Sequence, residues 1–445
     1  MSFPRYERYK DSGVEWLGEV PEGWSNARLA YACALVVDGT HFSPESHPEG
    51  DYRYVTAKNI KESGFDFSEI TYVTRDNHEE IYSRCPVRKG DVLYIKDGAT
   101  AGIAMVNTLD DEFSLLSSVA LLRPRDGVLQ AGYLAYHLND PLFKSRVLAS
   151  VQGGAMTRLT VDAISRFALV LPPPADQTAI VAFLDREIAK IDALIAEQQR
   201  LIELLKEKRQ AVISHAVTMG LNPDAPMKDS GIEWLGEVPA HWDVRRLGFL
   251  ADLIQTGPFG SQLHSEDYVE NETPVINPSN IQDGQIIPDS SCTVGQEIVE
   301  RLGQHKLMAG DIVIGRRGEM GRCARVSEKE VGWLCGTGSL NVRLNRLVVS
   351  EFVSIYLRTM YVRELLRLES VGSTMDNLNT AILSCIPLPI PPLEEQSAIA
   401  AFLDRETAKL DALTAEAQTA ISFLQERRTA LISAAVTGKI DVRRL

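Results

Sequence analysis

The sequence predicts an α/β protein in which two mixed α/β domains are separated by a long antiparallel two-helix coiled coil, as a pseudo-twofold internal repeat. Residues 176–218 and 395–437 are versions of one helical segment, identical at 27 of 43 positions, with a constant offset that takes position 185 to position 404. A box, KDSGVEWLGEVPEGW at 10–24, returns as KDSGIEWLGEVPAHW at 228–242. Each box is followed by a stretch of ordinary domain length and then by the helix. We therefore expect a tandem duplication.

The boundaries follow from these repeats. We expect an N-terminal box at 1–24, a first domain at 25–174, a central helix at 175–219, a second box at 220–242, a second domain at 243–392 and a C-terminal helix at 393–445. Short β-rich runs such as 92–95 and 312–314, separated by Gly, Asp and Pro, predict small mixed domains, with helices at 131–150 and 351–370. Trp16, Trp24, Trp234 and Trp242 are expected to anchor the boxes by packing.

An apolar seam of period 3.5 runs along both helical segments, which is typical of helices that pack lengthwise. A 43-residue helix spans roughly 65 Å, longer than one domain needs for its own core. The second segment has no other partner of matching length, so the two are expected to pair antiparallel. Polar residues in the seam, Gln198, Arg209 and Arg428, are interpreted as setting the register. The apolar seam positions, expected to bury coiled-coil and partner contacts, are Leu184, Ile188, Ile191, Ile195, Ile202, Leu205, Leu403, Leu410, Ile421 and Leu424.

The formal net charge of −14 argues against a free-standing nucleic-acid-binding protein, which is usually basic. One local exception is RRGEMGRCAR at 316–325, with four arginines. The first residues lack an apolar targeting core and no run of 18 apolar residues occurs, so a cytoplasmic protein without a membrane role is expected. The six cysteines are far apart and without metal-ligand spacing, and are expected to be reduced thiols in the cores.

Catalytic motifs are missing from the sequence. The loop that holds a flipped adenine in methyltransferases has two prolines and an aromatic residue, whereas NPSN at 277–280 has one proline and no aromatic residue. The glycines of GPFGS at 257–261 are interpreted as a loop, and no nucleotide-binding P-loop or metal-nuclease spacing is present. We expect a non-catalytic chain with no cofactor or metal of its own, whose function is recognition.

Base edges are read by Asn, Gln, Arg, Lys and Ser/Thr side chains, mostly on loops. Arg316 and Arg317 are the strongest individual candidates, since Arg to guanine or to phosphate is a common contact. YVTAKNIKESGFDF at 54–67 aligns with VINPSNIQDGQII at 275–287, and VQGGAMTRLT at 151–160 aligns with VGSTMDNLNT at 371–380. The Asn and Gly residues at these aligned places could equally serve turns within each domain. The DNA-binding candidates in the first domain are Thr40, His41, Lys58, Asn59, Lys96, Gln152, Thr157 and Arg158, and those in the second are Ser261, Gln262, Asn277, Asn280, Arg316, Arg317, Arg322, Thr374, Asn377 and Asn379.

The helices QTAIVAFLDREIAKIDALI and QSAIAAFLDRETAKLDALT, together with the two boxes, resemble the specificity subunit (HsdS) of Type I restriction-modification enzymes over essentially the whole chain. The resemblance implies two target-recognition domains, each reading one half of an asymmetric bipartite site in double-stranded DNA. It implies that the helices bind two methyltransferase (HsdM) subunits and that restriction/translocase (HsdR) subunits join, directing adenine methylation and restriction. S-adenosylmethionine would then lie on the methyltransferase partner, and ATP and Mg on the restriction partner.

Two other functions stay open on the residues alone. An autonomous DNA-binding protein would bind tightly without partners, and a scaffold whose domains bind proteins would select no DNA motif. For a bipartite target, we expect half-sites on one face of the duplex, about one helical turn or a multiple of it apart. Partners that supply most phosphate contacts would reconcile this function with the acidic composition.

Overall fold

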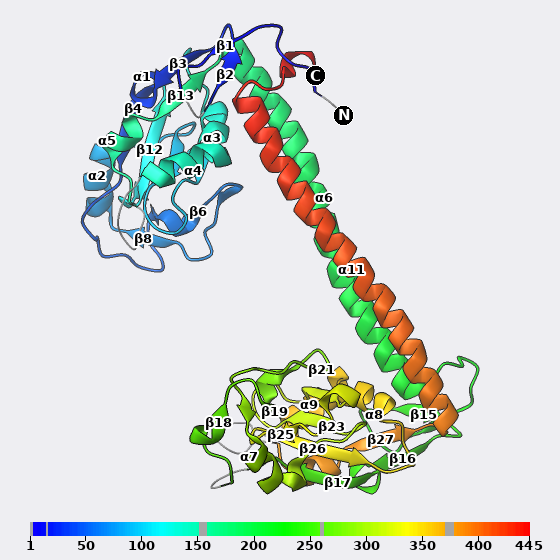
Figure 1. Ribbon diagram of the computed structural model, residues 1–445. Coiled ribbons are helices and arrows are strands. Elements are labelled where there is room, and N and C mark those ends of the chain that lie inside the picture. Colours follow the sequence, from blue (N-terminus) through cyan, green and yellow to red (C-terminus); the bar gives the residue numbers. More distant parts are fainter. Residues whose placement is uncertain (1–2, 15–16, 151–157, 259–261, 370–377) are drawn as a thin grey trace. The chain divides into compact units, whose positions relative to one another are not determined.

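The computed structural model describes residues 3–14, 17–150, 158–258, 262–369 and 378–445 (Figure 1). The chain forms two compact units. Unit 1 consists of two pieces of sequence, Met1–Gln199 and Thr419–Leu445, and unit 2 is the continuous piece Arg200–Gln418. Each unit therefore contains one head, which we define as its mixed α/β part, and half of each long helix.

The long helices are α6 (Pro174–Met219) and α11 (Leu393–Val436). Proline at the first position of α6 is favourable, because that residue has no helical hydrogen bond to donate. In unit 1, Arg428 Nε lies 3.2 Å from Asp192 Oδ1, and in unit 2 Arg209 Nε lies 3.1 Å from Asp411 Oδ1. In each unit the early half of one helix thus lies beside the late half of the other, and the predicted antiparallel pairing is confirmed.

The seam is buried as predicted. Ile195 and Leu424 are half-buried, and the other eight apolar seam positions are buried. Two threonines also occupy the α11 seam, Thr407 and Thr414. Their hydroxyls donate to the carbonyls of Leu403 and Leu410 one turn earlier, at 2.7 and 2.9 Å, so both hydroxyls are satisfied within the helix.

The head of unit 1 is built on a four-stranded antiparallel sheet of order β10-β9-β12-β4, with a second sheet of order β11-β5-β8. Its strands are β1 (Tyr9–Asp11), β2 (Glu19–Pro21), β3 (Ser25–Arg28), β4 (Cys33–Asp38), β5 (Tyr52–Val55), β6 (Ile60–Lys61), β7 (Gly64–Phe65), β8 (Thr71–Val73), β9 (Val92–Ile95), β10 (Ala104–Val106), β11 (Ser114–Leu115), β12 (Val119–Pro124) and β13 (Ala168–Leu171). Its helices are α1 (Leu29–Ala32), α2 (Arg75–Arg84), α3 (Ala131–Asn139), α4 (Pro141–Ser150) and α5 (Val161–Ser165).

The head of unit 2 repeats this plan, with a central antiparallel sheet of order β24-β23-β26-β17 and a second sheet of order β18-β22-β19-β25. Its strands are β14 (Met227–Asp229), β15 (Glu237–Pro239), β16 (Asp243–Arg246), β17 (Ala251–Thr256), β18 (Tyr268–Val269), β19 (Thr273–Ile276), β20 (Ile281–Gln282), β21 (Gln285–Ile286), β22 (Thr293–Val294), β23 (Ile312–Gly315), β24 (Cys323–Arg325), β25 (Leu334–Cys335), β26 (Ser339–Leu344) and β27 (Pro387–Ile390). Its helices are α7 (Gln296–Arg301), α8 (Ser350–Leu357), α9 (Met360–Glu369) and α10 (Thr380–Ser384). The predicted fold class, with mixed domains repeated around paired helices, is confirmed.

The two heads contain equivalent buried ion pairs. Asp91, 2% exposed, accepts two hydrogen bonds from the Arg123 guanidinium, both 2.8 Å long. Asp311, also 2% exposed, accepts the same two bonds from Arg343, at 2.8 and 2.7 Å. Two parallel hydrogen bonds fix both partners, so the turn before β9 is tied to β12 in unit 1, and the turn before β23 is tied to β26 in unit 2.

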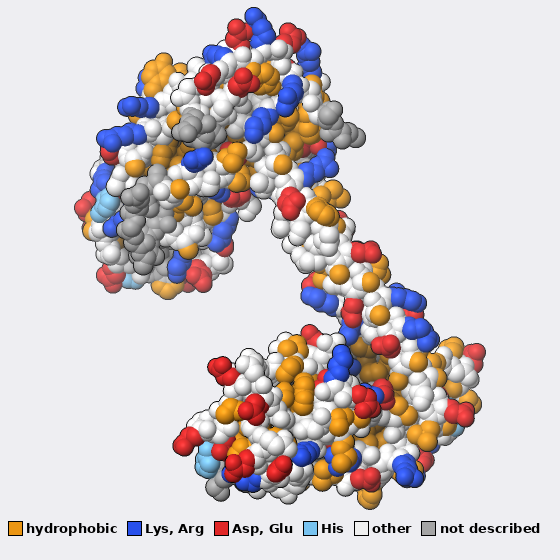
Figure 2. Space-filling view, viewed as in Figure 1, with side chains coloured by type: hydrophobic (Ala, Val, Ile, Leu, Met, Phe, Trp, Pro, Cys, Tyr) orange, Lys and Arg blue, Asp and Glu red, His pale blue; other side chains and the backbone are white. Residues whose placement is uncertain are grey.

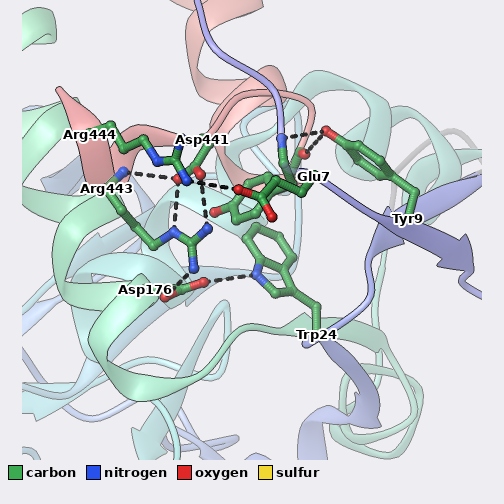
Figure 3. Close-up of polar contacts among 9 residues, drawn as sticks. Glu7, Tyr9, Trp24, Asp176, Asp441, Arg443 and Arg444 are labelled. Carbon is green, nitrogen blue, oxygen red and sulfur yellow. Dashed lines mark hydrogen bonds and ion pairs between the residues drawn. The ribbon is translucent and has the colours of Figure 1, made fainter.

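The N-terminal box and the C-terminal tail meet at the start of α6 in unit 1 (Figure 3). Asp441 donates its N–H to the Pro4 carbonyl at 2.8 Å and pairs with Arg443, which also lies 3.9 Å from Asp176. Asp176 in turn accepts a hydrogen bond from the Trp24 indole at 3.2 Å. One cluster of polar contacts therefore joins three segments that are distant in the sequence.

The tryptophans of the boxes pack largely as predicted. Trp24 and Trp242 are fully buried, which agrees with their predicted role as packing anchors. Trp234 is half-buried against the core of unit 2. Trp16 lies outside the described residues.

Two details differ from the sequence-based expectation. The helices expected at 131–150 and 351–370 each divide in two, because the chain leaves the helical conformation at Asp140, before α4, and at Thr359, before α9. The six cysteines are free thiols, but Cys385 is exposed and Cys292 is half-buried, so the prediction of six core thiols is wrong for these two. Across the described ranges, no helix is long and apolar enough to cross a membrane.

Candidate nucleic-acid interface

In each head, loops converge at one edge of the central sheet. β4 and β9 end where β12 begins, because Ala120 pairs with Asp38 and Val119 with Ile95. In unit 2, β17 and β23 end where β26 begins in the same way. Chain order and antiparallel pairing therefore bring three loops together at one edge.

Backbone hydrogen bonds join these loops to each other and to a fourth segment. In unit 1, Lys96 N donates to Ser118 O at 2.9 Å and Leu159 N donates to Lys96 O at 2.9 Å. In unit 2, Arg316 N donates to Gly338 O at 2.8 Å and Leu378 N donates to Arg316 O at 3.0 Å. We call these segments the convergent loops: 38–43, 96–102, 116–118 and 158–159 in unit 1, and 256–258, 315–321, 336–338 and 378–379 in unit 2.

A glycine is required where the first loop leaves the sheet. A Cβ at Gly39 would overlap the Leu115 carbonyl, and a Cβ at Gly257 would overlap the Gly336 carbonyl. The close approach of two backbones admits no side chain at either position. Close backbone packing therefore explains why glycine occupies the same place in both heads, at Gly39 and at Gly257.

The unit 1 loops carry a network of paired charges centred on Asp38, which is 4% exposed. Its carboxylate lies 2.9 Å from Arg84, 3.0 Å from His41 Nε2 and 3.5 Å from Lys96 Nζ. Lys96, itself buried, also lies 3.2 Å from Asp97, and Asp97 lies 3.8 Å from Arg158. Arg158 is mostly exposed, so among these basic side chains it is the one most available to a ligand.

The unit 2 loops present arginines where the unit 1 loops hold this network of paired charges. Arg316 donates from Nε to the Leu378 carbonyl at 3.1 Å, and burial together with the neighbouring charge of Arg317 lowers the pKa of Arg316. Arg317 is exposed and makes no hydrogen bond or ion pair with any described residue. Arg322 is paired with Glu319 at 2.8 Å. By alignment of the two heads, Lys96 corresponds to Arg316 and Asp97 to Arg317, so the charge is kept at the first position and reversed at the second.

Several asparagine candidates are occupied within their own loops. Asn59 accepts the Thr56 N–H at 3.0 Å and donates to Asp66 O at 3.1 Å, and Asn280 makes the equivalent bonds to Asn277 N at 2.9 Å and Ile287 O at 3.0 Å. Both are buried, which is the turn chemistry that the sequence had left open.

Three further candidates are also occupied. Asn277 donates to the Cys292 sulfur at 3.1 Å, and Asn379 caps α10 by accepting the Ile382 N–H at 2.9 Å. The Thr40 hydroxyl, buried, lies within hydrogen-bonding distance of the Phe42 backbone.

The remaining candidates divide into exposed residues and residues outside the described ranges. Lys58 is exposed, 3.8 Å from Glu69, and Gln262 is exposed and accepts a hydrogen bond from Arg301 at its carbonyl. The candidates outside the described residues are Gln152, Thr157, Ser261, Thr374 and Asn377. Sequence reasoning missed Asp38 and Arg84, because the two residues of this ion pair are far apart in the sequence and no local pattern signals their contact.

The long helices expose a second set of apolar side chains beside the seam. In unit 1 these are Leu194, 50% exposed, and Phe423, 65% exposed; in unit 2 they are Leu201, Leu204 and Leu413, 41 to 52% exposed. Hydrophobic side chains are visible among charged ones along both helices (Figure 2). Leu194 and Leu413, and Leu204 and Phe423, are related by the repeat offset, so the exposure is duplicated. We call these five residues the exposed apolar stripe.

Comparisons with known proteins agree on one family. A family model described as the Type I restriction modification DNA specificity domain matches residues 21–204 and again 239–422. The MjaVIII specificity subunit of a Type I restriction enzyme of Methanocaldococcus jannaschii is 23% identical, covering 100% of this chain and 99% of the relative. The EcoKI specificity subunit of Escherichia coli K12 is 21% identical, and the alignment covers 96% of this chain and 91% of that relative.

Solved structures show the same fold. A chain from a structure of the assembly and conformational transition of a type I R-M system aligns over 94% of this chain and 98% of its own length, with a TM-score of 0.71 and 18% identity. The HsdS subunit of Thermoanaerobacter tengcongensis aligns over 95% of this chain and 98% of its own length, with a TM-score of 0.56 and 18% identity.

Proposed function

The chain belongs to the Type I restriction modification DNA specificity family, and on that premise we propose that it is the DNA-recognition subunit of a Type I restriction-modification complex. Its two heads would read the two halves of an asymmetric bipartite site. The observation that carries the proposal is the duplicated set of convergent loops, which is alike in backbone and unlike in side chains. Such a pair of heads suits a target whose halves differ in sequence.

The proposed DNA contacts come from the exposed members of the convergent loops. In unit 2 the exposed member is Arg317, whose guanidinium is unpaired among the described residues, and beside it lies the half-buried Arg316, which is held in place by Leu378. In unit 1 they are Arg158 and His41, which is half-exposed beside Asp38. Arginine offers two donors to guanine or to phosphate, which makes it suited to either base readout or positioning.

The exposed apolar stripe supports a proposal for the partners. Leucine and phenylalanine side chains more than 40% exposed on a helix pair gain free energy when another helix covers them. Because the stripe occurs in each unit, we propose one methyltransferase subunit on each, with restriction subunits joining that assembly.

We further propose that this chain performs no chemistry itself. The loops offer charge pairs and arginines for binding, while adenine methylation would use S-adenosylmethionine on the methyltransferase, and cleavage would use ATP and Mg on the restriction subunit. The acidic composition supports this division, since a chain with a net charge of −14 gains by leaving most phosphate contacts to its partners.

One experiment tests the function. The chain is expressed with and without its methyltransferase, methylated adenines are mapped in the host genome, and affinity for the resulting motif is titrated at several salt concentrations. We expect a single bipartite motif, weak and strongly salt-dependent binding by the chain alone, and tight binding after the partner is added. Equal affinity without the partner would favour an autonomous DNA-binding protein, and no enriched motif would favour a scaffold.

A further inference from the structure

One buried glutamine joins each head to its long helix. Gln177 lies in the first turn of α6 and Gln396 in the first turn of α11, related by the repeat offset, and both are 0% exposed. A fully buried amide is uncommon, and it persists when its donors and acceptor are all satisfied.

The bonds of Gln177 reach two separate parts of the unit 1 head. Its Oε1 accepts the Gln130 N–H at 2.8 Å, and its Nε2 donates to Val128 O and to Pro172 O, both at 2.9 Å. Val128 and Gln130 precede α3, which packs on the central sheet, whereas Pro172 follows β13. One side chain on the helix therefore holds both the sheet-covering helix and the strand that leads into α6.

Gln396 repeats this arrangement in unit 2. Its Oε1 accepts the Val349 N–H at 2.7 Å, and its Nε2 donates to Leu347 O at 3.3 Å and Pro391 O at 2.8 Å. Leu347 and Val349 directly precede α8, the helix on the central sheet. Pro391 directly follows β27, the strand that leads into the long helix. Both N–H donors and the carbonyl oxygen of the amide are engaged in both units.

From these contacts we infer that Gln177 and Gln396 are positioning residues that fix the direction in which each head leaves the long helices, and that they thereby set the selectivity for spacer length between the two half-sites. The inference rests on the proposed function. It assigns to two side chains a property distinct from base choice, because neither glutamine lies in the convergent loops.

The physical reason is the geometry of the duplex. Adding one base pair moves a half-site by about 3.4 Å and rotates it by about 35° around the DNA axis. The three hydrogen bonds of the buried amide would oppose such a rotation of the head relative to the long helix. A head that has lost these bonds leaves an N–H and two carbonyls unpaired at the joint, which loosens its attachment.

The test uses the chain in complex with its methyltransferase and a set of duplexes that carry both half-sites with the natural spacer and with one or two base pairs added or removed. Binding and initial methylation rate are measured for wild type, Gln177→Leu, Gln396→Leu and Gln177→Glu. Gln199→Leu, an exposed position on the same helix, is the matched control. Spacer selectivity is the ratio between the natural and altered spacers within one preparation, so partial loss of folded protein cancels.

We expect both leucine variants to lose about tenfold or more of the spacer selectivity, as unpaired buried groups imply. Single-base preferences within each half-site should stay unchanged. Gln177→Glu keeps the acceptor for Gln130 but sets a carboxylate oxygen against the carbonyls of Val128 and Pro172 in a fully buried site, so its loss of selectivity should equal or exceed that of Gln177→Leu. The control should match wild type.

Folded variants that keep the wild-type spacer profile would overturn the inference, as would a change in base preference at the half-sites instead. If one leucine variant does not fold, the equivalent variant in the other unit and Gln177→Glu decide the question in the same way. A wild-type complex with no bipartite target at all would contradict the proposed function, a result distinguishable from failure of the glutamine assignment.

Discussion

At the scale of single residues, the two heads carry different side-chain partners at places where their backbones agree. Lys96 and Arg316 occupy matching places in the convergent loops, yet Lys96 is buried beside two carboxylates and Arg316 donates to a carbonyl beside the exposed Arg317. A duplicated backbone can thus keep its loop contacts while its charges change, which is what two readers of different half-sites require.

Arg317→Ala tests the proposed interface in unit 2. If Arg317 contacts a base, the variant should lose about 1–3 kcal/mol of binding and relax one position of one half-site; a phosphate contact would instead lower affinity for all sequences and reduce the salt slope by about 1. Binding is measured by titration with the partner present. Arg346→Ala is the control, because Arg346 is exposed in the turn after β26, at the opposite edge of the same sheet. Equal losses in both variants would count against the interface.

His137 gives unit 1 a pH dependence that the matching position of unit 2 lacks. Burial lowers the pKa of His137 from 6.5 to about 4, and the residue at the repeat offset in unit 2 is Tyr356. Between pH 6.5 and 4 the unfolded chain binds a proton that the folded chain does not. This residue should therefore lower the free energy of unfolding of unit 1 by up to about 3 kcal/mol as pH drops through this window.

The measurement is hydrogen exchange of core peptides around His137, corrected for intrinsic rates, with peptides around Tyr356 as the internal reference. His137→Gln should remove this part of the pH dependence, because glutamine does not titrate. The same loss of protection in the variant would show that other groups cause it.

At the scale of elements, the paired helices are stabilised by their seam and joined to each other by two related ion pairs. Asp192 with Arg428 and Asp411 with Arg209 are copies of each other, related by the repeat offset. Arg428 also lies 3.4 Å from Glu62 of the unit 1 head and is 25% exposed, whereas Arg209 is 38% exposed and its ion pair is with Asp411. The unit 1 copy therefore joins head and helices.

We expect Arg428→Ala to destabilise unit 1 more than Arg209→Ala destabilises unit 2, although both effects should stay within about 1 kcal/mol because the pairs are partly exposed. Double-mutant cycles with Asp192→Ala and Asp411→Ala, followed by urea unfolding, give the coupling energies. Both couplings should shrink in high salt. A larger coupling for Arg209 would contradict the assignment.

Substitutions in the buried seam should lower stability much more than the loss of either ion pair. Leu184 and Leu403 are equivalent and almost fully buried, so Leu184→Ala and Leu403→Ala should each cost about 3 kcal/mol through lost burial and a residual cavity. The measurement is local protection from hydrogen exchange around each position. Leu194→Ala and Leu413→Ala, on the exposed apolar stripe, should leave the free chain's stability nearly unchanged and weaken methyltransferase binding instead.

At the scale of the whole molecule, the duplication predicts that substitutions in the two heads act independently. Arg158→Ala should alter the tolerance for base changes in one half of the target. Arg317→Ala should alter it in the other half, because the two residues belong to different units. For the double variant, the changes in binding free energy should add within about 0.5 kcal/mol, as expected for distant sites. Methylation rates on targets altered in one half at a time provide the measurement. Both substitutions acting on the same half would contradict a one-head, one-half assignment.

The sequence alone determined the features that repeat along the chain. The heptad seam, the two boxes and their common offset predicted two mixed domains and a pair of antiparallel helices, because helix period and duplication are local properties that need no coordinates. The same reasoning placed Trp24 and Trp242 in the cores.

Only the tertiary structure decided which polar side chains are available. Asn59 and Asn280 are indistinguishable in sequence from base-reading residues, but folding buries them against carbonyls of their own loops. The Asp38 network and the Gln177 and Gln396 joints depend on contacts between segments far apart in the sequence, which no local pattern records. A side chain's partners are set by three-dimensional proximity, so exposure and pairing came from the fold. They single out Arg158 among the candidates of unit 1, whereas Arg317 was already a leading candidate from the sequence.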